Sequence, residues 1–330
     1  MSARERVMFD SVTATAFARL HLGFLDMNGG LGRRFGSLGL AIDGRATRLS
    51  IRRAAGPRIE GPEAARASSH LACLKDSLRL ASDYDLQIHE AIPAHAGLGS
   101  GTQLALIVAA SVRRLECLPS NPAEDAILLQ RGARSGIGAG LFERGGLIVD
   151  GGRGAQTATP PVIARLEFPE EWRVILVIDP HTEGAHGQEE RAAFAQLENF
   201  AASAAGEICR LVLIKALPAV AEADLDSFGD AVTRIQDIVG DYFAPAQGGS
   251  AFASKAVGGV METLRRHGAK GTGQSSWGPT GFAFARDADE AHRLCGLVQE
   301  KVKASSLDIA VCKGLNHGAL VKGETFAAIK

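Results

Sequence analysis

The chain has 330 residues, of which 46% are hydrophobic and 22% are charged, and its formal net charge is −1. This composition is typical of a globular protein with a sizeable core and about two domains, and the near-zero charge excludes a general attraction to nucleic acid or anionic membranes. The five cysteines are dispersed and form no CxxC pair. They argue against a disulfide framework or a thiolate zinc site, so a reducing cytoplasm is the expected location.

No membrane association is expected from the sequence. The N-terminal MSARERVMFD carries charges without a following apolar core, so it does not resemble a signal peptide. The longest uncharged run, residues 96–112, is interrupted by Gly, Ser, Thr and Gln and is too short and too polar to span a bilayer.

The first half of the chain alternates strand and helix patterns. Segments 13–20 and 45–53 have strand character, and the glycine-dense segment 23–44 between them cannot form a helix interior. A helix is expected over 62–80, a strand follows over 86–92, and further helices run from the next glycine loop to about residue 118 and over about 122–133. A second glycine run then covers 136–146.

The second half begins after LEFPEEW, which we take as a domain boundary. RVILVID at 173–179 predicts a buried strand, and two or three helices are expected between 188 and 242. One of them carries an apolar stripe that predicts a core-facing helix, formed by Phe228, Val232, Ile235 and Val239. A helix over 250–267, a strand at the end of GAKGTGQSSWGPTGFAFA, a helix over 288–303 and a strand over 308–313 complete an α+β sandwich.

A glycine-rich loop at the start of a helix predicts a phosphate-binding site. In IPAHAGLGSGTQLAL, Gly97, Gly99 and Gly101 alternate with Leu98 and Ser100, and a helix starts near Thr102. Glycines let the backbone approach an anion, and the helix N-terminus adds about half a positive charge. The loop is neither a P-loop, because no Lys follows, nor GxGxxG, because Thr102 takes the sixth position. A tight turn without a ligand is the structural alternative.

The motif PxxxGLGSG-T resembles the phosphate-binding motif of the GHMP kinases, and GTGQSSWGPTGFAFA lies where that superfamily keeps a second glycine-rich motif. The resemblance covers the whole chain in motif order. It implies an N-terminal α/β domain with the phosphate loop over 1–170 and a C-terminal ferredoxin-like α+β domain over 171–330. The active site would lie between these two domains.

One position departs from the kinases of this superfamily. Many of them carry a catalytic aspartate in a pattern like GIxDQ before a Gly-Gly strand, whereas the matching stretch here is RSGIGAGLFERGGLIVDGG. The aspartate position falls on Ala139, which cannot accept a proton from a substrate hydroxyl.

Four stretches resemble a non-kinase branch of the superfamily, the beta-ribofuranosylaminobenzene 5'-phosphate synthases. They are ARLHLGFLDMNGGLGRRFGSLGLAI, IPAHAGLGSGTQLAL, GQSSWGPTGFAF and EGAHGQEERAAF. The resemblance implies a pentosyltransferase of tetrahydromethanopterin biosynthesis. It would join phosphoribosyl pyrophosphate to 4-aminobenzoate, or to a relative such as 4-hydroxybenzoate, with loss of CO2 and pyrophosphate. Mg²⁺ is the expected cofactor, no organic cofactor is expected, and a homodimer is anticipated.

The candidate residues divide by expected role. Arg19 and His21 lie two apart, so on a strand they face the same side and are candidates for anion binding and proton or hydrogen-bond donation. Asp26 is a candidate for metal or hydroxyl contact. The phosphate group is assigned to Gly97, Leu98, Gly99, Ser100, Gly101 and Thr102. Substrate contacts are assigned to His95, Gln103, Gln274, Ser275, Ser276 and Trp277, with the indole placed to stack on the aromatic ring.

Each candidate also has a structural explanation. Arg19 could be a surface strand residue, His21 a satisfied histidine, Asp26 a turn former, His95 a brace of the loop and Trp277 packing at the domain seam. Glu189 and Glu190 could simply open a helix. The arginines at 45, 48, 52, 53 and 58 could form a solvated strand face or recruit a phosphorylated substrate. HTEGAH contains HxE without the second ligand pair of a zinc site.

Two other functions remain open on the sequence. A kinase would need ATP and, because Ala139 cannot act as a base, a base at another position, such as Asp150 or an aspartate from elsewhere in the chain. A non-catalytic binder of phosphorylated metabolites would bind without turnover, but it leaves the polar set at 19, 21 and 26 unexplained.

Overall fold

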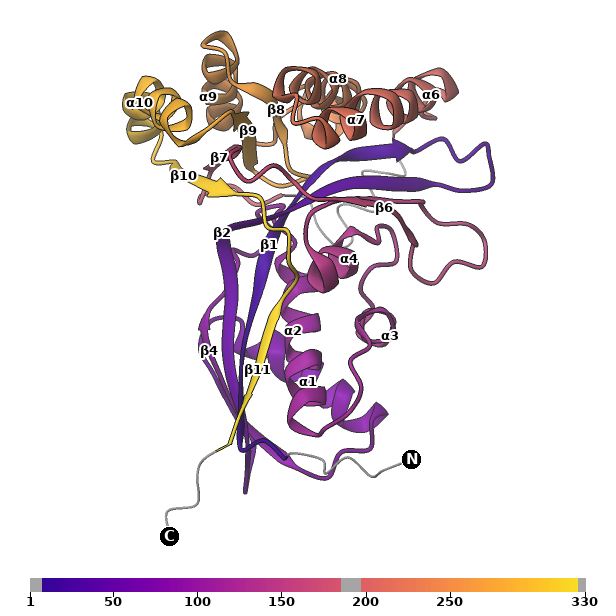
Figure 1. Ribbon diagram of the computed structural model, residues 1–330, viewed down its shortest axis with the longest axis vertical. Helices are drawn as coiled ribbons and strands as arrows, with labels where there is room; N and C mark the ends of the chain where they lie inside the picture. Colours follow the sequence, from indigo (N-terminus) through magenta and orange to yellow (C-terminus); the bar gives the residue numbers. More distant parts are fainter. Residues whose placement is uncertain (1–7, 185–196, 326–330) are drawn as a thin grey trace.

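Two sheets organise the chain in the computed structural model, which describes residues 8–184 and 197–325 (Figure 1). The larger sheet contains β1 (Ser11–Asp26), β2 (Phe35–Ala54), β3 (Arg58–Glu60), β4 (Asp83–Glu90), β5 (Leu147–Asp150), β6 (Val162–Leu166) and β11 (Leu320–Glu324). The smaller sheet contains β7 (Arg173–Ile178), β8 (Lys270–Gln274), β9 (Thr280–Ala285) and β10 (Asp308–Lys313).

The helices fall into two groups along the chain. The first comprises α1 (Ala64–Ser77), α2 (Ser100–Leu115), α3 (Pro122–Leu128) and α4 (Ile137–Arg144). The second comprises α6 (Ala202–Leu211), the π-helix η1 (Val212–Ala216), α7 (Leu217–Ala221), α8 (Leu225–Phe243), the 3-10 helix η2 (Ala244–Gln247), α9 (Lys255–Arg266) and α10 (Ala288–Ala304). Side chains of Asn121, Asp224, Ser254 and Asp287 cap α3, α8, α9 and α10.

The larger sheet runs in the order β11-β1-β2-β4-β3. Strand β5 pairs with the N-terminal half of β2, at Ser37 to Leu40, and β6 pairs with β5. Its strand pairs are antiparallel except for β3 with β4. Buried and less buried residues alternate along the first ten residues of β1, as a sheet covered on one face requires. The buried face packs against α1 and α2 in an apolar cluster that includes Val12, Leu86 and Ile107.

The smaller sheet has the order β10-β7-β9-β8, and all its pairs are antiparallel. Numbered along the chain these strands read 4-1-3-2, and the path β7–α9–β8–β9–α10–β10 is the ferredoxin-like β-α-β-β-α-β motif. The alternation within β7 separates two cores, because Ile175 and Val177 pack on α9 and α10 whereas Val174 and Leu176 face α8 and the larger sheet. The predicted fold class is therefore confirmed.

The α8 stripe lies in the core between the two sheets. Phe228, Val232, Ile235 and Val239 are all buried in one cluster with residues of β1, β2 and β9. Figure 1 shows the far half of the β1–β2 pair running beneath α6, α7 and α8. The hairpin thus belongs to the larger sheet and also lies beneath α6, α7 and α8.

Strand β1 is irregular where it passes from one role to the other. Its register against β2 shifts between Phe17 and Arg19 and again between His21 and Gly23. Such bulges bend a strand and redirect its side chains. The segment from Arg19 to His21 is therefore the part of β1 that bends. Before it, β1 packs against α1 and α2; after it, β1 packs against α6 and α8.

The structure differs from the sequence-based elements at several places. The second glycine run contains helix α4, because the glycines allow close packing: a Cβ at Gly138 would lie 2.8 Å from the Thr102 side chain and one at Gly140 would lie 2.6 Å from Val162. Helix α3 ends at Leu128 rather than near residue 133, and Gln130 and Gly132 follow with positive φ. Strand β8 and the closing strand β11 were not predicted.

Strand β11 also crosses the expected domain division. The chain does pass from the larger to the smaller sheet between β6 and β7, near residue 170, but β11 returns and pairs with β1 from Ser11↔Glu324 to Thr15↔Leu320. The last strand of the expected C-terminal domain therefore belongs to the N-terminal sheet. Within the described residues, no helix is both long enough and apolar enough to cross a membrane.

Candidate active site

The glycine loop leads into α2 with a backbone that favours glycine. Gly97 and Gly99 both have φ of +81°, and Gly99 is the N-cap of α2 without a side-chain cap. The N–H groups of Thr102 and Gln103 both donate to the Gly99 carbonyl at 3.1 Å. The first turn contains no acidic residue. The positive end of the helix is thus left for an anion from outside the chain.

A second loop from the smaller sheet packs directly on the first. A Cβ at Gly97 would lie 2.2 Å from the Ser275 carbonyl oxygen, and one at Gly278 would lie 2.3 Å from the Ala96 carbonyl. The Ser275 hydroxyl donates to the Gly97 carbonyl at 2.8 Å, and the Thr280 hydroxyl donates to the Ala96 carbonyl at 2.6 Å. The backbones of the two glycine-rich loops are therefore in direct contact, and we call this contact the seam.

Arg19 and His21 of β1 are attached to this seam. The Arg19 side chain donates from Nη1 to the Gly97 carbonyl at 2.7 Å, and its backbone N–H donates to the Leu98 carbonyl at 3.1 Å. The backbone N–H of His21 donates to Ser275 Oγ at 3.0 Å. The bulged segment of β1 and both loops therefore hold one another in place.

A cavity of about 600 Å³ opens over the glycine loop. We call it the larger cavity; it is lined by Arg19, Arg66, His95, Gly97, Gly99, Ser100, Gly101, Thr102, Arg131, Gly184, Ser276, Trp277 and Gly278. Three of these residues are arginines, and none of the lining residues in the described part of the chain is acidic. Together with the helix N-terminus, this lining suits a multiply charged anion.

A smaller cavity of about 240 Å³ adjoins the larger one. It is lined by Arg19, His21, Phe24, Thr102, Gly132, Arg134, Ser135, Ile137, Gly138 and Ser276. Arg19, Thr102 and Ser276 line both cavities, so these three residues form the neck between them. The smaller cavity combines apolar walls from Phe24 and Ile137 with the cationic head of Arg134.

His21 lies in the wall of the smaller cavity as a neutral ring. Its side chain is buried, packs edge-on against Phe24 with 4.4 Å between ring centroids, and has no hydrogen-bond partner for Nε2 among the described residues. Burial and the nearby positive charge of Arg19 lower the pKa of His21 to about 3. At neutral pH this imidazole is therefore uncharged in the folded chain, and its predicted role in hydrogen bonding or proton donation stays a prediction.

The structure brings most of the predicted site residues to the two cavities. Those that line one or both are Arg19, His21, His95, Gly97, Gly99, Ser100, Gly101, Thr102, Ser276 and Trp277. Trp277 also packs against Phe243, with 4.3 Å between ring centroids, so its side chain contributes to packing as well as lining the larger cavity. The catalytic and binding roles of these residues stay predictions.

Five predicted residues have structural positions instead. Asp26 accepts from the N–H groups of Asn28 at 2.7 Å and Gly29 at 3.0 Å, which shapes the turn after β1 away from both cavities. Gln103 donates to the Gly138 carbonyl and links α2 to α4. Gln274 joins the loop at 253 to β8 by accepting from the Ala253 N–H. Leu98 is fully buried, and Ser275 links the two loops as described above.

Sequence reasoning missed four polar residues of the cavities: Arg66, Arg131, Arg134 and Ser135. The last three lie together in RGARSG: Arg134 and Ser135 begin the stretch RSGIGAGLFERGGLIVDGG that matches the kinase aspartate region, and Arg131 lies three residues before it. Arg66 lies in the first turn of α1, where nothing in the local sequence distinguishes it.

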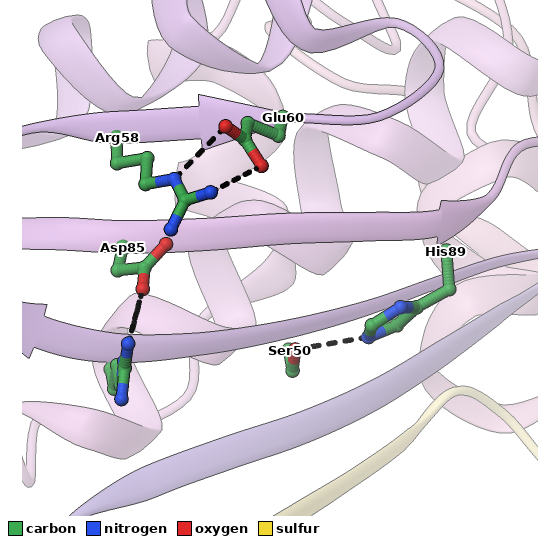
Figure 2. Close-up of polar contacts among 6 residues, drawn as sticks. Ser50, Arg58, Glu60, Asp85 and His89 are labelled. Carbon is green, nitrogen blue, oxygen red and sulfur yellow. Dashed lines mark hydrogen bonds and ion pairs between the residues drawn. The ribbon is translucent and has the colours of Figure 1, made fainter.

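The basic run at 45–58 does not belong to the cavities. Each arginine pairs with a carboxylate: Arg45 with Asp308 (3.9 Å), Arg48 with Glu90 (2.9 Å), Arg52 with Asp85 (2.7 Å), Arg53 with Glu116 (3.0 Å) and Arg58 with Glu60 (2.9 Å). Figure 2 shows part of this polar network on β2, β3 and β4, where Ser50 also contacts His89. For Arg48, Arg52 and Arg58 these pairs favour the solvated strand face over substrate recruitment. Arg53 instead is half-buried and also donates to the Leu115 carbonyl at the end of α2.

Comparison with known proteins places the chain. Family models for the "GHMP kinases N terminal domain" and "GHMP kinases C terminal" match residues 65–143 and 216–303. Proteins named beta-ribofuranosylphenol 5'-phosphate synthase are similar over most of the chain. The one from Archaeoglobus fulgidus is 36% identical over 67% of this chain and 74% of its own length. The one from Methanocaldococcus jannaschii is 30% identical over 81% of this chain and 87% of its own length.

The chain belongs to the beta-ribofuranosylphenol 5'-phosphate synthase family. It is accordingly an enzyme of the transferase class within the GHMP kinase superfamily. Solved structures agree on the fold. Homoserine kinase from Cytophaga hutchinsonii has a TM-score of 0.68 at 15% identity, covering 97% of this chain and 100% of its own. Mevalonate diphosphate decarboxylase from Staphylococcus aureus has a TM-score of 0.66 at 12% identity, covering 96% and 98%.

Neither Ala139, at the position of the kinase aspartate, nor Asp150, the alternative base, offers a carboxylate to the cavities. Ala139 is buried in the apolar cluster of the larger sheet and lines neither cavity. Asp150 is fully buried and accepts from Ser135 Oγ (3.0 Å) and from the N–H groups of Gly136 (3.0 Å) and Gly152 (2.9 Å). Burial raises the pKa of Asp150 against the effect of these hydrogen bonds. Asp150 thus orders the loop that carries Arg134 and Ser135.

The described residues of the two cavities do not suit a metal held by protein ligands. Carboxylates and waters are the usual Mg²⁺ ligands, but the described lining of the larger cavity offers arginines, hydroxyls and backbone N–H groups. Within residues 8–184 and 197–325 no cluster of three or more His, Cys, Asp or Glu side chains could hold a metal ion. In HTEGAH, His186 lies outside the described residues, as do Glu189 and Glu190. The described residues thus assign no step of the reaction to Mg²⁺.

Proposed function

We propose that the chain transfers a 5-phosphoribosyl group from phosphoribosyl pyrophosphate to the ring of a para-substituted benzoate, with loss of CO2 and diphosphate. The observation that carries the proposal is the pair of adjoining cavities. One is lined by three arginines and an uncapped helix N-terminus, the other is partly apolar with Arg134, and both share Arg19, Thr102 and Ser276. A polyphosphorylated donor and an aromatic acid acceptor are ligands of complementary chemistry for these two spaces.

The reaction balances without an oxidant or a reductant. The bond between ribose C1 and the diphosphate oxygen breaks, and the electron pair leaves with diphosphate. The ring carbon that bears the carboxylate forms a bond to C1, and the bond to the carboxylate then breaks, returns its electrons to the ring and releases CO2. Arginines and oriented N–H groups in the larger cavity would stabilise the charge that develops on the leaving group.

The acceptor is proposed to carry an electron-donating group opposite its carboxylate, because such a group makes the attacking carbon nucleophilic. The names of both relatives describe a phenol product, which favours 4-hydroxybenzoate, whereas the aminobenzene branch named above would use 4-aminobenzoate. Both acids fit the same reasoning. A place in tetrahydromethanopterin biosynthesis follows from the family resemblance and stays part of the proposal.

The kinase alternative has less support. Ala139 is buried, and Asp150 is also buried and accepts three hydrogen bonds. Neither position offers a base to a substrate hydroxyl. A metabolite binder would share the cavities, so only turnover separates it from the synthase.

The test is an assay of purified protein with phosphoribosyl pyrophosphate and either 4-hydroxybenzoate or 4-aminobenzoate labelled in the carboxyl group. We expect equal amounts of labelled CO2 and diphosphate without added ATP, and the faster acid identifies the acceptor. Absence of CO2 from both acids, together with ATP consumption on a small alcohol, would replace the proposal with the kinase. Binding of the donor without turnover would replace it with the binder.

A further inference from the structure

Two arginines from separate elements converge on the first turn of α2. Arg66 extends from α1 and Arg131 from the loop after α3, and both line the larger cavity. A Cβ placed on Gly101 would lie 2.7 Å from Nη2 of Arg66 and 3.3 Å from Nη1 of Arg131. The two guanidinium groups therefore meet over the same glycine of the phosphate loop, where a larger residue would displace them.

Among the described residues, one carboxylate pairs with these two arginines. Arg66 donates to the Glu63 carboxylate at 2.8 Å, whereas Arg131 forms no ion pair with a described residue. Nε of Arg131 has no hydrogen-bond partner among residues 8–184 and 197–325. Burial and the neighbouring charge of Arg66 lower the pKa of Arg131. Two close cations beside a helix N-terminus call for an anion with more than one charged group.

We propose that Arg66 and Arg131 form a diphosphate clamp, in which one phosphate of the ligand lies on the glycine loop and the other between the two guanidinium groups. This inference rests on the proposed function for the identity of the ligand, the diphosphate of the ribosyl donor. It fixes the direction of the donor. The leaving group occupies the larger cavity, ribose C1 points to the neck at Arg19, Thr102 and Ser276, and the acceptor enters from the smaller cavity.

A histidine next to the pair provides a reporter of the bound charge. His70 of α1 is buried, and its Nε2 has no hydrogen-bond partner among the described residues. Burial, Arg131 and Arg66 lower the pKa of His70 to about 4. A bound diphosphate offsets the two positive charges, so the pKa of His70 should rise on binding. This shift is measurable by NMR of the imidazole and needs no turnover.

The experiment measures binding of inorganic diphosphate and orthophosphate by calorimetry in the presence of EDTA. It compares the wild type with Arg66→Gln, Arg131→Gln and the control Arg58→Gln, whose side chain lies on the open sheet face and pairs with Glu60. We expect diphosphate to bind at least about 10-fold more tightly than orthophosphate, and each clamp variant to lose about 10-fold or more in diphosphate affinity. Arg58→Gln should match the wild type. Thermal unfolding verifies that the variants fold, and Arg131→Lys replaces Arg131→Gln if the latter does not.

The outcomes separate the clamp from the function. Wild-type diphosphate affinity in both clamp variants, or equal binding of diphosphate and orthophosphate by the wild type, overturns the clamp. If turnover is observed while these results hold, the clamp alone is wrong. If diphosphate binding depends on Arg66 and Arg131 and the His70 signal shifts, but neither benzoate releases CO2, the clamp stands and the proposed reaction fails.

Discussion

Arg19 combines two tasks in one side chain. Its guanidinium group holds the Gly97 carbonyl at 2.7 Å and also lines both cavities. We expect Arg19→Lys to keep the charge but lose the planar fork, and to lower kcat/KM by about 10-fold to 100-fold, which corresponds to about 1.4 to 2.8 kcal/mol. Steady-state kinetics with both substrates measures this effect, and circular dichroism verifies the fold. Kinetics close to the wild type would show that the side chain is only a brace of the strand.

Two buried neutral histidines make stability depend on pH. The pKa values of His21 and His70 are lowered to about 3 and about 4, so in acid the unfolded chain binds protons that the folded chain does not. Stability should therefore be highest above the unfolded pKa of about 6.5 and fall as the pH decreases toward these folded values, by about 2 kcal/mol per histidine at pH 5.

Urea unfolding at pH 7 and pH 5 measures this dependence. In His70→Asn the loss between the two pH values should be smaller by about 2 kcal/mol, because one of the two titrating groups is gone. His89→Asn, on the open sheet face, is the matched control. An unchanged pH dependence in His70→Asn would show that His70 is protonated or accessible in the folded protein.

At the scale of elements, contact between the two glycine-rich loops should be essential. Gly97 and Gly249 have nearly the same φ, +81° and +82°, but a Cβ at Gly97 would lie 2.2 Å from a carbonyl oxygen, whereas one at Gly249 meets nothing within 4 Å. Both alanine variants carry the backbone cost of about 1–2 kcal/mol. Only Gly97→Ala should additionally separate the loops, with a larger loss in melting temperature and at least about 10-fold lower activity. Equal effects of the two variants would contradict the close approach.

The same loops show what the sequence could reveal. The phosphate loop was predictable because a helix N-terminus with alternating glycines is a local feature of consecutive residues. Arg66 and Arg131 were not, because α1 and the α3–α4 loop bring them to Gly101 from distant parts of the chain. Helix α4 was not predicted within the second glycine run, because its glycines serve close packing on Thr102 and Val162, which the local sequence does not show. Strand β11 has five residues with a weak pattern, and its partner β1 lies more than 300 residues away.

At the scale of the whole molecule, β11 ties the end of the chain to its beginning. Strand β10 lies in the smaller sheet, the connection at Asn316 exchanges hydrogen bonds with the backbone of Phe168, and β11 then pairs with β1, the strand that carries Arg19 and His21. Val321 packs on the apolar cluster of the larger sheet, whereas Lys322 is exposed. The arrangement predicts that the two sheets unfold together.

Val321→Asp tests this coupling, with Lys322→Asp as its control on the opposite face. The first should lower the free energy of unfolding by about 2 kcal/mol or more because it places a charge against the core, and the second by less than about 0.5 kcal/mol. The tryptophans Trp172 and Trp277 pack against Phe228 and Phe243 of α8, so their fluorescence reports on the core between the two sheets. If β11 couples the sheets, the fluorescence transition of Val321→Asp shifts together with the circular dichroism transition. A fluorescence midpoint that stays at the wild-type value while the circular dichroism midpoint falls would mean that the smaller sheet unfolds independently, and that β11 is only an edge strand of the larger one.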